Sequence, residues 1–234
     1  PELPSQVAYI SSFNQLPVLL TTDADFCPLL KGGHIGGVLH LDENLDVCET
    51  LSKYVGCEEL PEGTSEIAYL ELVSVYFCLS FWQEKLKGKS ILLHTDNSVV
   101  FYAISRGRSR NATICRLAHE ILMLSHSLLC PLLCQWLPSK TNPADLLTRR
   151  SLDTKTESEI TKALLNDHGL RVQAMHWDDD VPDVVKKEWF SADDYPDGAF
   201  DPDNQYFVRD LYEDGQSIPD RLKFRRRNYK NKGE

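Results

Sequence analysis

The sequence predicts an α/β fold: a mixed five-stranded sheet with helices packed on it, followed by an irregular acidic C-terminal extension. Short apolar runs follow one another closely at the start, which predicts strands joined by tight turns. Later apolar runs alternate with segments of helical apolar spacing, which predicts strands joined by crossover connections. Beyond residue 151 acidic residues and scattered Pro increasingly replace the apolar periodicity, which predicts the extension.

Composition divides the chain into three parts. Residues 1–16 form an N-terminal lead-in, 17–150 carry the sheet domain, and 151–234 form an acidic, partly extended tail. A hydrophobic content of 42% is enough for the core of one domain of ordinary size. No run reaches the roughly 18 apolar residues of a membrane helix, so no membrane partner is expected.

Three strands are predicted in the first part of the domain. The apolar run in PVLLTTDADF at 17–26 predicts a buried strand, HIGGVLHL at 34–41 is the second strand, and the KGG before it supplies a turn. Residues 45–55 form the third strand. Because the connections are short, these strands are expected to form an antiparallel meander.

Helices and strands alternate in the second part of the domain. A long helix is predicted from about Thr64 to Lys85, with Thr64 or Ser65 as its N-cap. The remaining expected elements are a strand at 90–96, helices at 97–105 and 110–128, a strand at 132–138 and a last helix that NPADLLTRR opens.

The predicted tail begins with a short helical stretch at 156–170 and then changes in charge. Residues 178–220 hold 14 acids and three bases, whereas 221–232 hold seven bases and no acid. This basic run could bind nucleic acid, serve as a nuclear address, or fold back onto the acidic segment. The net charge of −10 argues against a general nucleic-acid coat protein, but it says little about any single surface.

The cysteines favour a reducing compartment. There are seven, an odd number, and none forms a CxxC pair. Cys78 and Cys115 lie within apolar helical patterns, where reduced core thiols are the simpler interpretation. The expected location is intracellular, in the cytoplasm or the nucleus.

Four acidic residues lie at positions where the presence of a carboxylate requires an explanation. Asp23 lies inside the first strand, although Asp25 shares its face and could take its place. Asp96 ends the fourth strand, Glu71 lies near the apolar stripe of the long helix, and Asp145 opens the last helix. Singly, each has an ordinary explanation as a helix cap, a stripe-edge residue or a dipole partner. Together they predict a divalent-cation site, because converging carboxylates repel one another without a cation.

A family resemblance rests on four stretches in order, over about residues 17–150: TTDAD…GGHIGGVL, YLELVSVYFCLSFWQEKLKGKSILLHTDN, GRSRNATICRLAHEIL and WLPSKTNPADLLTRR. They resemble the ribonuclease H domain of retroelement reverse transcriptases, nearest to gypsy-like and DIRS-like retrotransposons. The resemblance implies a ribonuclease H-like fold and an endonuclease that cleaves the RNA strand of RNA–DNA hybrids by two-metal hydrolysis. It implies two Mg²⁺ ions, with Mn²⁺ as a possible substitute, and a polymerase domain of the same polyprotein as partner.

The resemblance also implies which residues act. Its four catalytic, metal-binding acids correspond to Asp23, Glu71, Asp96 and Asp145. Two departures stand out: Asp25 replaces a common Ser, and the loop PSKTN lacks the His that cellular ribonucleases H carry there. A non-catalytic scaffold or connection domain of the same fold is therefore the alternative function. A DDE-type integrase is disfavoured, because its acids come in the order Asp, Asp, Glu.

Several side chains are candidates for contacts with the nucleic acid: Asn97, Arg106, Arg108, Arg110, Lys140, Asn142 and Arg149. The alternation of Arg with small residues in SRGRSR suits phosphate contacts, since guanidinium groups match phosphate oxygens. A solvated turn between two helices is the plain alternative. His94 and Trp136 lie on apolar strands and are expected in the core.

Overall fold

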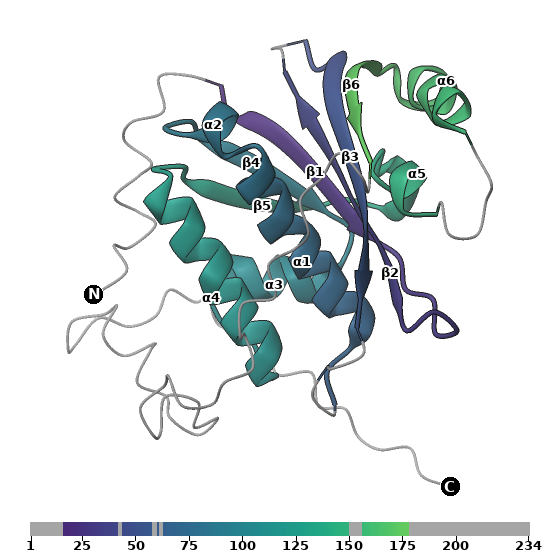
Figure 1. The fold of residues 1–234 in the computed structure, drawn as a ribbon. Coiled ribbons are helices and arrows are strands. Elements are labelled where there is room, and N and C mark those ends of the chain that lie inside the picture. Colours follow the sequence, from purple (N-terminus) through teal and green to yellow (C-terminus); the bar gives the residue numbers. More distant parts are fainter. Residues whose placement is uncertain (1–15, 42–43, 58–59, 61–62, 150–155, 178–234) are drawn as a thin grey trace, which may run out of the picture. The chain divides into compact units, whose positions relative to one another are not determined.

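The computed structural model describes residues 16–41, 44–57, 60, 63–149 and 156–177. The predicted lead-in up to residue 15 and the predicted tail from 178 onward, with its basic run, lie outside the described residues. Figure 1 shows the elements, which follow in chain order: β1 (Val18–Ala24), β2 (Gly32–His40), β3 (Val47–Gly56), α1 (Glu66–Phe81), α2 (Gln83–Leu86), β4 (Ile91–Thr95), α3 (Ser98–Arg106), α4 (Ala112–Ser127), β5 (Leu132–Trp136), η2 (Ser139–Thr141), α5 (Asp145–Thr148), α6 (Glu157–His168) and β6 (Arg171–His176).

The sheet is mixed, as predicted, in the order β5-β4-β1-β2-β3-β6. Strands β1, β2 and β3 pair antiparallel, and β4 and β5 join β1 in parallel. The sixth strand, β6, pairs parallel with β3 and was not predicted as a strand. Its residues were assigned to the tail, because RVQAMH is short and half polar and therefore gives only a weak strand pattern.

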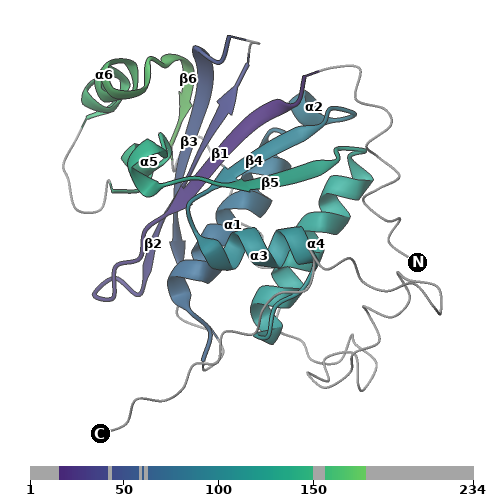
Figure 2. The same ribbon diagram turned by 180° about the vertical axis from the view of Figure 1, so that it is seen from behind.

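Helices cover both faces of the sheet (Figures 1 and 2). On one face α1, α3 and α4 pack over the larger core, and on the other α5 and α6 pack over a smaller one. The smaller core draws on residues far apart in the chain: Val38, Cys48, Ala144, Leu147, Ile160, Leu164, Leu170 and Trp177. Residues 156–177 therefore belong to the packed structure of the sheet.

Two neighbouring glycines of β2 let helices approach on opposite faces. A Cβ atom at Gly36 would lie 2.9 Å from Cγ2 of Thr148 on α5, and one at Gly37 would lie 2.3 Å from Sγ of Cys78 on α1. Successive strand residues face opposite sides, so each glycine removes the side chain that would hold one helix away. The Ser74 hydroxyl then donates to the Gly36 carbonyl at 2.8 Å, which fixes α1 on the sheet.

Helix α1 begins at the N-cap Ser65, whose hydroxyl accepts from the Ala68 amide, so Ser65 rather than Thr64 is the cap. The helix is apolar on most sides and buried along most of its length. Glu71 is therefore fully enclosed instead of lying at the edge of an apolar stripe. Across the described ranges, none of the helices is both long and apolar enough to cross a bilayer.

The packing of α6 gives the first prediction. Leu164 is fully buried in the smaller core, whereas its neighbour Leu165 is about half exposed. Leu164→Ala should lower the free energy of unfolding by about 2–5 kcal/mol, because it leaves a cavity. Leu165→Ala is the matched control and should change it by less than about 0.5 kcal/mol. Urea unfolding measures both, and equal small effects would show that α6 does not belong to the core.

Candidate metal centre

Asp23 is a buried carboxylic acid in the middle of the sheet. It lies on β1 opposite Gly36 of β2, with 4% of its surface exposed. Each of its oxygens accepts one hydrogen bond: Oδ2 from the Thr148 hydroxyl at 2.5 Å and Oδ1 from the Asn142 amide at 3.3 Å. Both donors come from the segment that contains α5. This segment therefore fixes the orientation of the carboxyl group.

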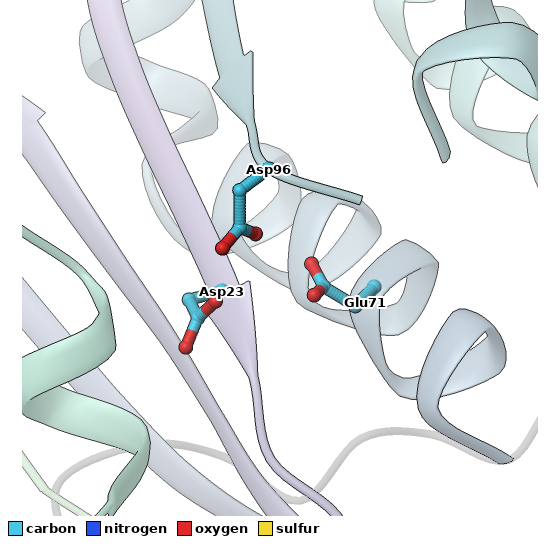
Figure 3. Close-up of side chains that lie close together, drawn as sticks. All are labelled: Asp23, Glu71 and Asp96. Atoms are coloured by element: carbon cyan, nitrogen blue, oxygen red, sulfur yellow. The ribbon is translucent and has the colours of Figure 1, made fainter. Parts of the chain in front are cut away.

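Asp96 and Glu71 reach the same place from other elements. Strand β4 runs parallel to β1, and Asp96 follows directly after its last residue. Helix α1 packs against β1 and β2 and presents Glu71. One carboxylate oxygen from each of Asp23, Glu71 and Asp96 lies within 4.8 Å of the others. Figure 3 shows the three side chains, which come from β1, α1 and the end of β4. Asp23 and Glu71 are buried, and Asp96 is partly exposed.

This arrangement fits a divalent cation. Among the described residues, Oε2 of Glu71 is a buried oxygen without a hydrogen-bond partner. The side-chain amide of Asn97 donates to the same carboxyl group, which leaves Oε2 as the acceptor without a donor. A buried acceptor with no donor is unfavourable unless a ligand satisfies it. In the described ranges, no ion pair involves any of the three clustered acids. Their carboxylates supply the hard oxygen ligands that Mg²⁺ and Mn²⁺ prefer.

Burial raises the pKa of Asp23 from its usual 3.8 to about 8, because the charged form loses water. The hydrogen bond from Thr148 opposes this rise. The negative charges of Asp96 and Asp145 add to it, and the positive charge of Arg149 opposes it.

Burial likewise raises the pKa of Glu71 well above its usual value, and the charges of Asp23 and Asp96 raise it further. The hydrogen bond from Asn97 acts in the opposite direction. Two acids in the cluster thus resist ionisation in the absence of a cation. A divalent ion would reverse this preference, because metal ligands bind as carboxylates.

Asp145, the fourth predicted ligand, lies outside the cluster formed by the other three. It is the first residue of α5, and its side chain is 25% exposed. Nε of Arg149 lies 2.9 Å from both of its carboxylate oxygens. Its charge nevertheless acts on Asp23, so Asp145 lies within electrostatic reach of the centre.

Asp25 takes a different role from Asp23. Its Oδ1 accepts a hydrogen bond from the His34 amide at 2.5 Å, across the start of the β1–β2 connection. Of the two acids that the sequence left as alternatives, Asp23 is the one in the carboxylate cluster.

The candidate substrate residues fall into two groups. Asn97 and Asn142 work inside the protein: Asn97 caps α3 and donates to Glu71, and Asn142 is buried and donates to Asp23. The others lie on the surface of the protein: Arg106, Arg108, Arg110, Lys140 and Arg149. A contact between these residues and nucleic acid stays a prediction.

The turn after α3 presents two of these cations to solvent. Gly107 ends α3 in the left-handed conformation that favours glycine, and Arg108 and Arg110 follow it exposed. Arg106, the last residue of α3, has its guanidinium over the Tyr102 ring, 4.5 Å from the centroid, which orients this cation just before the turn.

Two residues at the site escaped the sequence analysis. Thr148 was not singled out, although its place three residues after Asp145 in NPADLLTR was visible. Trp136 was expected in the core, and this was wrong: 49% of it is exposed, and its indole Nε1 donates to the backbone carbonyl of Asp96 at 2.8 Å. The physical reason is that β5 is an edge strand and Trp136 is its last residue.

No protein-family model matches the chain, and no curated protein matches it. Several solved structures are similar to it, among them three ribonuclease H proteins. Ribonuclease H1 from Halobacterium salinarum NRC-1 shares 17% identity over 59% of this chain and 98% of its own, with a TM-score of 0.44. The N-terminal RNase H domain of a Mycobacterium tuberculosis protein, fused to maltose-binding protein, shares 16% identity over 60% of this chain and 96% of its own, with a TM-score of 0.48. LC11-RNase H1 was isolated from compost by a metagenomic approach and solved in complex with an RNA/DNA hybrid. It shares 19% identity over 63% of this chain and 99% of its own, with a TM-score of 0.43.

The buried Asp23 predicts a pH dependence of stability. Its pKa of about 8 in the folded protein exceeds the ordinary 3.8, so the folded chain keeps a proton that the unfolded chain loses between these values. Without a divalent ion, this group therefore lowers the free energy of unfolding as the pH rises through that window. Mg²⁺ should offset the loss, so we expect it to raise the melting temperature more at about pH 8.5 than at about pH 6. Scanning calorimetry measures this, and equal shifts would argue against binding at Asp23.

The hydrogen bond from Thr148 to Asp23 gives a third prediction. Thr148→Val keeps the shape of the side chain and removes the donor, which should destabilise the fold by about 1–3 kcal/mol. Mg²⁺ affinity, measured by calorimetric titration, should fall about 10- to 100-fold, because the ligand loses its orientation. Thr148→Ser keeps the hydroxyl and should retain most of the affinity. Loss of affinity in both variants would assign the effect to packing instead.

Proposed function

We propose that the chain is a divalent-metal-dependent endonuclease that cleaves the RNA strand of RNA–DNA hybrids, as the ribonuclease H part of a retrotransposon reverse transcriptase. The observation that carries the proposal is the cluster of Asp23, Glu71 and Asp96, with a buried unpartnered oxygen on Glu71. The motifs HTDN and NPADLLTR, which resemble those of retroelement ribonuclease H domains, support the choice of substrate and of element.

The residues of the centre fall into two groups: acids that would bind the ions, and side chains that orient those acids. Asp23, Glu71 and Asp96 would bind Mg²⁺, and Asp145 would join them as the fourth ligand for a pair of ions. When bound, the ions supply the positive charge that the transition state of phosphodiester hydrolysis requires. Thr148, Asn142 and Asn97 orient the buried carboxyl groups through neutral donors. A neutral donor orients a carboxylate without removing the negative charge that attracts the cation.

The surface cations would hold the nucleic acid. Arg106 ends α3, and Arg108 and Arg110 lie in the turn after it. The N-cap of the same helix, Asn97, directly follows Asp96. Guanidinium groups can bind successive phosphates without reading bases. Such an enzyme recognises its substrate by groove shape and the 2′-hydroxyl, so no sequence preference is expected. A polymerase domain of the same polyprotein would be the partner, in a reducing compartment inside the cell.

One assay tests this function. With Mg²⁺ or Mn²⁺, the protein should cut the RNA strand of an RNA–DNA hybrid and leave duplex DNA intact, which labelled strands on a denaturing gel would show. Asp96→Asn should abolish cutting and leave the metal-free fold intact or slightly more stable, because it removes one acid from a cluster whose members oppose one another's ionisation. Absence of cutting by the wild type with either ion would favour the non-catalytic scaffold. A strongly destabilised Asp96→Asn protein would make Asp96 chiefly structural.

A further inference from the structure

The ion pair between Arg149 and Asp145 is built differently from the rest of the metal centre. Neutral donors orient the carboxyl groups of Asp23 and Glu71, whereas the carboxylate of Asp145 is paired with the positively charged guanidinium of Arg149. Nε of Arg149 donates to Oδ1 of Asp145 at 2.9 Å and lies 2.9 Å from Oδ2, so the guanidinium faces both carboxylate oxygens. The fourth acid therefore already has a cation.

The backbone of α5 offers little freedom to change this pairing. Leu147 is fully buried in the smaller core, and its carbonyl accepts a hydrogen bond from the Ser52 hydroxyl of β3 at 2.9 Å. Thr148 is bound to Asp23. With the helix fixed on both sides, only side-chain rotation can bring the Asp145 carboxylate to an ion held by the other three acids.

Arg149 is the partner that can leave. Its side chain is 61% exposed, so the guanidinium can move into solvent, whereas Asp145 is only 25% exposed. Both charges act on Asp23, and they act with opposite sign. An ion that recruits Asp145 must therefore compete with a guanidinium that is already in place.

We propose that Arg149 is a positioning residue that keeps Asp145 paired while the centre is metal-free, so that a divalent ion must displace the guanidinium before Asp145 can act as a ligand. This inference rests on the proposed function. It makes ion uptake stepwise: Asp23, Glu71 and Asp96 bind first, and the ion that needs Asp145 binds more weakly than the carboxylates alone would allow. Exposed ion pairs at this spacing are weak, so the competition is about two- to fivefold in affinity.

Titration of the full chain with Mg²⁺ alone, followed by calorimetry, tests the proposal without any assay of cleavage. Arg149→Ala should bind Mg²⁺ about two- to fivefold more tightly at the weaker step than the wild type. Arg149→Gln removes the charge with a smaller change of side chain and should behave alike. Because the Arg149 side chain is exposed, both substitutions should leave the fold intact.

A double-mutant cycle separates the ion pair from a general effect of charge. In an Asp145→Asn background there is no carboxylate to release, so Arg149→Ala should no longer tighten binding. Arg171→Ala is the matched control, since it also removes one positive charge and an exposed ion pair, with Asp46 at 2.7 Å. It should leave Mg²⁺ affinity unchanged.

Each result has one meaning. An unchanged affinity in Arg149→Ala, an equal gain in the Asp145→Asn background, or an equal gain in Arg171→Ala would overturn the role of Arg149. Wild-type protein that binds no Mg²⁺ at all would overturn the metal-dependent function itself, and the inference with it. Wild-type binding with no effect of Arg149 refutes only the inference.

Discussion

The buried carboxyl group of Asp23 is the constraint on which the rest of the centre depends. An acid inside a sheet is unfavourable unless donors surround it. Here the donors are Thr148 and Asn142, which lie more than a hundred residues further along the chain. These two hydrogen bonds to Asp23 therefore also hold the segment that carries α5 against the sheet. The same bonds place Asp145 within electrostatic reach of the centre.

The sheet can carry such a segment because its second face is also packed. Gly36 removes the side chain that would block α5, and Gly37 does the same for α1 on the opposite face. Helix α6 then covers α5 and joins it in the smaller core through Leu164. The site therefore draws on elements of both helix layers: α1 supplies Glu71, and the segment that carries α5 supplies the donors Thr148 and Asn142.

Much of this could be read from the sequence. Short apolar runs and helical spacing predicted five of the six strands, since pattern and burial coincide in the central strands. β6 escaped because an edge strand has one weakly buried face, and Trp136 was misplaced for a related reason. The hydrogen bonds of Thr148 and Asn142 could not be predicted, because sequence spacing does not show which distant groups a fold brings together.

The distribution of charge distinguishes the three clustered acids from Asp145. Burial and the neighbouring negative charges make two of the acids resist ionisation, and the neutral hydroxyl and amide groups that orient them oppose this effect. Ionising these acids therefore costs the metal-free fold stability as the pH rises. A basic side chain in the cluster would remove that penalty, but it would also take the place of a cation. Within the described part of the chain, Asp145 is the one candidate acid of the four that forms an ion pair, and its partner Arg149 is exposed. Negative charge is thus left unbalanced where an ion must be held, and is balanced reversibly at the margin of the centre.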